Sequence, residues 1–222
     1  MTDVTLAELV DRVERLAAER PGGRVIVGIV GAPGSGKSTL AELLVATLRD
    51  RTGVDDAVAL VPMDGFHLAQ VQLDALGRSD RKGAPDTFDA AGFTALLRRI
   101  RDGGLPGRPD VYAPRFERSI EEPIAGSVRI GADARIVIVE GNYLLLDRDG
   151  WSDAAALLDE AWFLRVPQEV RIGRLVARHR LFGRSEADAQ AWAAEVDEPN
   201  ARLIEASAGR ADLVVEIADP LG

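Results

Sequence analysis

Residues 25–38 read VIVGIVGAPGSGKS, an apolar run followed by a glycine-rich stretch. The run Val25–Val30 is apolar throughout, which is typical of a strand buried on both faces of a parallel sheet. The next eight residues, Gly31 to Ser38, match the pattern G-x-x-x-x-G-K-[ST], and a helical pattern follows them. Strand, loop and helix together predict a loop whose backbone N–H groups surround phosphates at a helix N-terminus.

Each residue type in this loop has a chemical role. Glycine allows the backbone to turn its N–H groups inward, Lys37 reaches the β- and γ-phosphates, and the hydroxyl of Ser38 is a ligand for Mg²⁺. A glycine-rich turn without a ligand is the alternative interpretation. We predict a nucleoside triphosphate site formed by Gly31, Ala32, Pro33, Gly34, Ser35, Gly36, Lys37, Ser38 and Thr39.

Further apolar runs, separated by helical patterns, extend this unit to an α/β fold. We predict strands over 57–61, 136–139, 161–166 and 213–217, and helices near the N-terminus and over 39–50, 93–101, 170–181 and 187–196. The expected architecture is a single domain, residues 1–222, with a parallel sheet of about five strands and helices on both faces. Residues 103–131 are rich in proline and glycine and are expected to leave the sheet on the substrate side. Residues from about 167 to 198 are expected to form a helical lid.

Composition excludes several functions. The chain has no cysteine and two histidines, so disulfides, thiolate metal sites and cysteine nucleophiles are excluded. A net charge of −9 disfavours general binding to nucleic acid or to an anionic membrane. The N-terminus lacks the basic start and apolar run of a signal peptide. We expect a cytoplasmic protein whose partner is a small molecule, and a homodimer is left open. Only two of the 27 basic residues are lysines, Lys37 and Lys82, so either could mark a site that requires lysine.

Two carboxylates follow predicted strands, where α/β proteins bind ligands. Asp64 comes shortly after the second strand and would lie near the γ-phosphate, where it could accept the proton of an attacking hydroxyl. It could equally cap a helix beginning near His67. Glu140 ends the run 136–139, an arrangement that orients Mg²⁺. A surface residue at a strand end is the alternative for Glu140.

An arginine-rich run, RIGRLVARHRLFGR, occupies residues 171–184. Arg171, Arg174 and Arg178 share one helical face, and Arg180 and Arg184 follow. Such arginines can close over phosphates and neutralise the charge that develops in transfer, whereas a solvated basic face is the alternative. We interpret His179 in this run as a packing or lid residue. Because no N-K-x-D or LSGGQ-like motif occurs, a small-molecule kinase is the leading class.

Five segments occur in a characteristic order over residues 24 to about 217: GAPGSGKSTLAELL, VPMDGFH, RKGAPDTFD, VIVEGNYLLLD and the arginine-rich run. In these segments the chain resembles the phosphoribulokinase/uridine kinase family of P-loop kinases, which includes type I pantothenate kinase. It is similar in particular to a bacterial branch labelled sugar (fructose) kinase or nucleoside/nucleotide kinase-like. Two positions depart from the family: Tyr112-Ala113-Pro114 replaces the Tyr-Ser-His of pantothenate kinase, and His67 stands where uridine kinases have an aromatic residue.

This resemblance implies an ATP- and Mg²⁺-dependent kinase that transfers the γ-phosphoryl group to a hydroxyl of a sugar, nucleoside or pantothenate-like metabolite. The alternative is a regulatory ATP-binding protein or ATPase without a small-molecule acceptor. The implied catalytic residues are Asp64, Lys37 and Arg178, with Arg174 also on the nucleotide and residues 207–211 near the adenine. Ser38 and Glu140 are the implied metal ligands. The implied acceptor-binding residues are Asp64, His67, Arg81, Lys82, Tyr112, Arg115 and Glu140.

Overall fold

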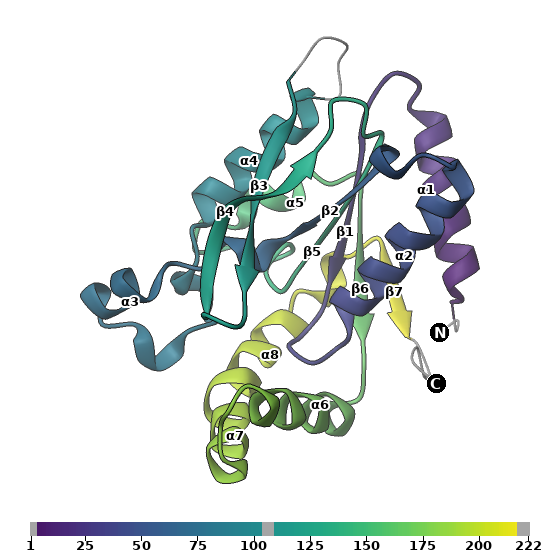
Figure 1. Cartoon of the computed structure of the whole chain (residues 1–222). Coiled ribbons are helices and arrows are strands. Elements are labelled where there is room, and N and C mark those ends of the chain that lie inside the picture. Colours follow the sequence, from purple (N-terminus) through teal and green to yellow (C-terminus); the bar gives the residue numbers. More distant parts are fainter. Residues whose placement is uncertain (1–3, 104–108, 217–222) are drawn as a thin grey trace.

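A computed structural model describes residues 4–103 and 109–216 of the chain. Five parallel strands form the central sheet in the order β2-β5-β1-β6-β7 (Figure 1). Their apolar runs were the sequence signal, and the predicted five-stranded α/β architecture is confirmed. The end of the last predicted strand, residue 217, lies outside the described residues. The bounds are β1 Val25–Val30, β2 Val58–Pro62, β5 Ile136–Gly141, β6 Glu160–Arg165 and β7 Leu213–Glu216.

Helices cover both faces of the sheet, as alternating side chains of the strands require. In β1, Val25, Val27 and Ile29 belong to one buried cluster, which also includes residues of α1 (Leu6–Glu19) and α2 (Lys37–Thr52). Ile26 and Val30 belong to a second cluster on the opposite face. That cluster takes in residues of α4 (Ala90–Gly103), α5 (Ser152–Ala155) and α8 (Glu198–Glu205).

Strands β3 (Val111–Glu117) and β4 (Glu122–Ile130) form an antiparallel hairpin that is separate from the central sheet. Of the predicted excursion over residues 103–131, residue 103 is the last residue of α4 and residues 104–108 lie outside the described residues. Gly65, in the short turn Met63–Phe66 after β2, packs so closely on this hairpin that a side chain would collide with the Pro114 carbonyl. The hairpin therefore packs directly on the turn that contains Asp64.

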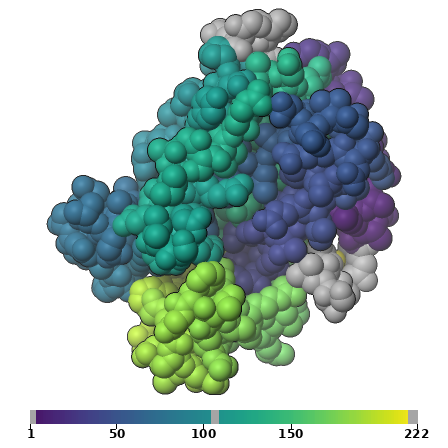
Figure 2. All heavy atoms as spheres, viewed as in Figure 1, coloured from purple at the N-terminus to yellow at the C-terminus, as the bar shows by residue number. Residues whose placement is uncertain are grey.

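The region predicted as a lid forms α6 (Gln168–Leu181), α7 (Glu186–Trp192) and a π-helical turn, Ala193–Asp197, that leads into α8. Figure 2 shows these yellow-green helices as a lobe against the hairpin, and Figure 1 shows them at the carboxyl ends of the central strands. The base of α6 packs directly on the glycine-rich loop, because a side chain at Gly34 would collide with the Arg171 carbonyl oxygen. A short helix, α3 (Gln70–Leu76), projects on the far side of the hairpin (Figure 1).

Candidate active site

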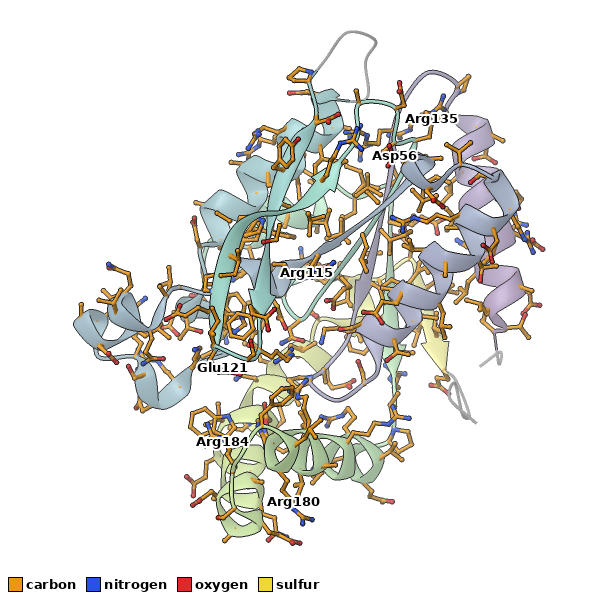
Figure 3. The ribbon with its side chains drawn as sticks, viewed as in Figure 1. Asp56, Arg115, Glu121, Arg135, Arg180 and Arg184 are labelled. Carbon is orange, nitrogen blue, oxygen red and sulfur yellow. The ribbon has the colours of Figure 1, made fainter. Side chains whose placement is uncertain are left out.

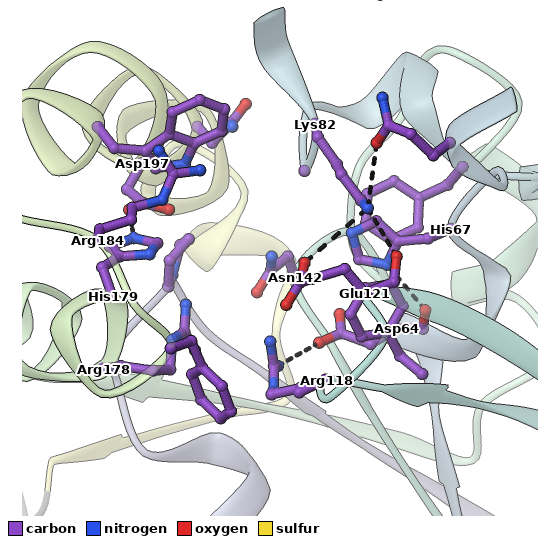
Figure 4. Close-up of a pocket in the computed structure, with 18 of the residues that line it drawn as sticks. Asp64, His67, Lys82, Arg118, Glu121, Asn142, Arg178, His179, Arg184 and Asp197 are labelled. Atoms are coloured by element: carbon purple, nitrogen blue, oxygen red, sulfur yellow. Dashed lines mark hydrogen bonds and ion pairs between the residues drawn. The ribbon is translucent and has the colours of Figure 1, made fainter. Parts of the chain in front are cut away.

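A cavity of about 660 Å³ lies at the carboxyl ends of the strands, between the lid lobe, the glycine-rich loop and the β3–β4 hairpin (Figure 4). Parallel strands bring their carboxyl ends to one edge, so residues far apart in the chain meet there. The predicted site residues that line this cavity are Pro33, Lys37, Asp64, His67, Lys82 and Arg178.

The glycine-rich loop has the backbone that a phosphate site needs. Gly34 and Gly36 have φ of 79° and 88°, in the left-handed region that favours glycine. A Cβ on Gly31 would lie 2.9 Å from the carbonyl oxygen of Leu164, so this position also requires glycine. Helix α2 begins at Lys37, which is buried, and its N-terminus faces the loop. The loop can therefore bind phosphate through backbone N–H groups, a helix N-terminus and one ammonium.

Asp64 lies in the turn after β2 and its carboxylate faces the cavity. Its Oδ2 accepts a hydrogen bond of 3.1 Å from Nη2 of Arg118. Burial would raise the pKa of Asp64, but positive charge outweighs this effect and lowers that pKa. The charge comes from His67 at the low pH where its ring is protonated, and from Lys37 and Arg118. The helix-cap alternative is wrong, because α3 begins only at Gln70, whose N–H group donates to the Glu122 carboxylate.

Glu140 occupies the end of β5 and is 4% exposed, so the surface alternative for this residue is wrong. Burial raises the pKa of Glu140 to about 7, against the opposing effects of Lys37 and of a hydrogen bond with Ser38. A carboxylate buried in this way is stabilised by a nearby cation. Carboxylate and hydroxyl oxygens are ligands suited to Mg²⁺, so Glu140 and Ser38 fit the predicted metal.

His67 is packed between two phenylalanine rings, with ring centroids 4.0 Å from Phe88 and 4.7 Å from Phe116. Its Nδ1 lies 2.8 Å from the carbonyl oxygen of Asp64. A carbonyl oxygen only accepts, so Nδ1 carries the proton and Nε2 of the neutral ring is an acceptor. Burial lowers the pKa of His67, although Asp64 opposes the shift, so the neutral ring is favoured. Nε2 is thus suited to accept a hydrogen bond from a substrate hydroxyl.

Lys82 reaches the cavity from the loop after α3. Its Nζ donates to the carbonyl oxygen of Glu121 at 2.8 Å and lies 5.4 Å from the centre of the Phe116 ring. The neighbouring Arg81 is placed differently, because its guanidinium pairs with Asp86 at 3.0 Å and is not among the cavity-lining residues. The structure therefore brings Lys82, but not Arg81, to the site.

Tyr112 and Arg115 are exposed on β3 and do not line the cavity. The pairing register of the hairpin shifts between Ala113 and Arg115. Since side chains alternate along a strand, such an irregularity moves the inward face from odd-numbered to even-numbered positions. The hairpin residues that line the cavity, which the sequence analysis missed, are Phe116, Arg118, Ser119 and Glu121. Asn142, which follows β5, was also missed.

The lid arginines divide by their contacts. Arg178 lines the cavity, where burial and the charge of Arg118 lower its pKa. Nη1 of Arg174 lies 3.4 Å from the Ser35 carbonyl oxygen, at the glycine-rich loop. Arg171 is buried and makes an ion pair of 3.1 Å with Glu198 of α8. Arg174 and Arg178 thus lie at the predicted phosphate region. Arg171 instead lies in the protein interior, paired with Glu198.

The last two arginines of the run also differ. Arg180 pairs with Glu186 at 3.4 Å, and both side chains are exposed. Arg184 stacks on the Trp192 ring at 4.0 Å and lines the cavity. Figure 3 shows Arg184 on the side of the lid lobe that faces the hairpin and Arg180 farther from it. His179 bonds to Asp197 at 2.8 Å, a contact within the lid lobe.

A second cavity, of about 850 Å³, is lined in part by Arg171. It is bounded by the end of β6, the start of α6 and one face of α8, and it includes Gln168, Arg202 and Glu205. Residues 207–211 line neither of the two cavities. Arg210, in that segment, pairs with Asp147 at 2.8 Å.

Comparisons with known proteins agree with this geometry. The chain is 42% identical to the solved structure of a "putative fructose transport system kinase" from Silicibacter sp. TM1040, covering 95% of this chain and 98% of that one with a TM-score of 0.84. It is 38% identical over 164 residues to a "putative uridine kinase" of Schizosaccharomyces pombe, covering 72% of this chain and 68% of the relative.

The chain is also 33% identical over 211 residues to the uncharacterized protein YggC of Escherichia coli, covering 95% of this chain and 85% of that protein. No family model matches. Across the described residues, no helix has both the length and the apolar character needed to cross a membrane.

Proposed function

Because the chain belongs to the phosphoribulokinase/uridine kinase family of P-loop kinases, we propose that it transfers the γ-phosphoryl group of ATP to a hydroxyl of a small metabolite. One observation carries the proposal. Lys37, Asp64 and Arg178 come from three distant segments, and all three line the same cavity. A phosphate-binding cation, a carboxylate and a lid cation around one space are the parts that phosphoryl transfer requires.

The residues divide the work as follows. The backbone of the glycine-rich loop and Lys37 bind the phosphates of ATP. The Asp64 carboxylate accepts the proton of the attacking hydroxyl, and Nε2 of His67 orients that substrate by accepting a second hydrogen bond. Arg178 neutralises negative charge on the transferred group. Ser38 and Glu140 would hold Mg²⁺, which when bound neutralises charge on the β- and γ-phosphates.

The two cavities suggest where each substrate binds. The cavity beside Asp64 takes the acceptor, and its 660 Å³ lie within the range of about 300–1,000 Å³ typical of small-ligand pockets. We place the base of ATP in the second cavity, because Arg171 lines this cavity and also donates to the carbonyl oxygen of Pro33 in the glycine-rich loop. A regulatory ATP-binding protein needs no acceptor cavity, so the space beside Asp64 favours an enzyme.

The acceptor is a sugar, a nucleoside or a pantothenate-like polyol. The acceptor side of the cavity offers hydrogen-bond donors and acceptors next to the rings of Phe88 and Phe116, a mixture suited to a polyhydroxylated ligand. The names of two relatives, which mention fructose and uridine, fall within these classes.

The test is ADP release by the purified protein with ATP, Mg²⁺ and a panel of fructose, uridine, cytidine, ribosides and pantothenate. We expect one class of acceptor to stimulate ADP release and to yield a phosphorylated product detectable by mass spectrometry. Lys37→Ala serves as the control and should remove the stimulation. Binding of ATP without stimulation by any hydroxyl compound would favour the regulatory alternative.

A further inference from the structure

Arg118 forms the one side-chain hydrogen bond that the described structure gives to the Asp64 carboxylate. Its Nη2 lies 3.1 Å from Oδ2, and Figure 4 shows the pair on the floor of the cavity. Arg118 comes from the end of the β3–β4 hairpin and was not among the residues implied by the sequence. The catalytic base proposed above is therefore paired with a cation.

Such a pair opposes the reaction of Asp64 as a base. A carboxylate accepts a proton through an oxygen that is free to face the attacking hydroxyl, and a guanidinium bound to it makes it less basic. The ion pair would thus hold Asp64 in a poorly reactive state. This matters in a kinase because a water molecule in the acceptor cavity is a competing nucleophile for bound ATP.

The side chain of Arg118 is also able to move away from Asp64. Its side chain is 40% exposed, and its described polar contacts are the Asp64 pair and the face of Phe116, 5.7 Å from its guanidinium carbon. It shares the cavity with Arg178, another cation, and like charges repel at close range. This repulsion weakens the hold of the pair on Arg118, so a bound acceptor can replace Arg118 on Asp64.

We propose that Arg118 is a latch on the catalytic base, which holds Asp64 until the acceptor hydroxyl replaces it and so suppresses hydrolysis of ATP by water. The inference rests on the proposed kinase function. In the suppressed reaction, the oxygen of water forms a bond to the γ-phosphorus and its proton passes to Asp64. The bond from that phosphorus to the β,γ-bridging oxygen breaks, and the products are ADP and inorganic phosphate. Arg118 is in this sense a positioning residue that acts through Asp64.

The experiment measures ADP release from ATP and Mg²⁺ with no acceptor added. Arg118→Gln removes the cation and should raise this rate by about five- to tenfold, because losing an adjacent cation typically raises the pKa of a carboxyl by about one unit or more. Arg118→Lys keeps a charge and should stay near wild type. The double variant Arg118→Gln/Asp64→Asn should lose the increase, since the latch acts only through Asp64. Arg129→Gln, an exposed arginine of the same hairpin, is the matched control and should leave the rate unchanged.

Two results overturn the latch. One is an unchanged or lower acceptor-free rate in Arg118→Gln, with ATP affinity and melting temperature like wild type. The other is an increase that persists when Asp64 is also replaced. If Arg118→Gln proves unfolded, Arg118→Met is measured in its place with the same expectation. Binding of ATP, measured in parallel by calorimetry, separates this inference from the proposed function, because failure to bind ATP would refute the kinase itself.

Discussion

Arg171 was predicted as a lid arginine, and its surroundings now predict a structural role. Its guanidinium pairs with Glu198 at 3.1 Å, and the two side chains are 5% and 8% exposed. The same guanidinium donates to the carbonyl oxygen of Pro33, and Gln168 donates to Glu198. The pair thus joins the first turn of α6 to α8 and to the glycine-rich loop. Removal of either partner leaves a buried charge without its counter-ion.

The magnitude follows from this burial. Breaking a buried ion pair by removing one partner costs about 3–5 kcal/mol. Arg171→Met should lie at the lower end, because Gln168 still donates to the remaining Glu198 carboxylate. Glu198→Met should lie at the upper end, because Arg171 then keeps only the Pro33 carbonyl oxygen. For a chain of this length each kcal/mol lowers the melting temperature by about 2–4 °C, so losses of roughly 6–20 °C are expected.

Thermal unfolding followed by circular dichroism measures this effect. The double variant Arg171→Met/Glu198→Met buries no unpaired charge and should recover much of the loss, since apolar replacements of buried pairs are often neutral or stabilising. Arg180→Met, on the exposed face of the same helix, should have the same melting temperature as wild type. The reasoning fails if Arg171→Met melts within about 2 °C of wild type while its turnover collapses, because Arg171 would then act in the chemistry.

Four further predictions concern the cavity. Lys37→Ala should abolish turnover in a folded protein, and Asp64→Asn should lower kcat by about 10²-fold or more with ATP affinity retained, both measured by coupled assay and calorimetry. Arg178→Ala should lower kcat and kcat/KM together, whereas Arg180→Ala should leave both unchanged. Burial lowers the pKa of His67 in the folded protein. As the pH falls, this imidazole therefore becomes protonated in the unfolded chain before it does in the folded protein. The stability that neutral His67 contributes is therefore present above about pH 6.5 and lost as the pH falls, and His67→Asn should flatten that decline in urea titrations.

The sheet and the phosphate loop could be predicted because their signals are local. Buried parallel strands are apolar along their whole length, and the runs at 25–30 and 136–139 contain no polar or charged residue. In the loop, Gly34 and Gly36 require left-handed backbone, which a sequence records directly as glycine. Asp64 and Glu140 follow strands at one edge, so their meeting follows from parallel topology alone.

The acceptor side of the site could not be predicted in the same way, because it depends on pairing geometry. Tyr112 and Arg115 were placed by resemblance, yet Tyr112 lies on the outer face of β3 by ordinary alternation. The irregularity after Ala113 turns Arg115 outward as well and brings Phe116 and Arg118 to the cavity. A shift of one position along a strand reverses which side chains face inward. Where a strand contains both polar and apolar residues, the sequence pattern does not predict such a shift. Arg81 is a similar case, because its ion pair with Asp86 depends on the path of the loop after α3.

Arginine and lysine usage adds a separate argument about the site. The chain has 27 basic residues and only two lysines, and both Lys37 and Lys82 line the same cavity. A guanidinium is a wide planar fork, whereas an ammonium is a compact charge with three donors. The ammonium of Lys82 donates to the Glu121 carbonyl oxygen at 2.8 Å and lies 5.4 Å from the centre of the Phe116 ring. Lys37 is buried at the start of α2, where close approach to the proposed phosphate would favour the smaller group. The two positions where the chain departs from its preference for arginine are thus at the two ends of the proposed reaction, one at the nucleotide and one at the acceptor.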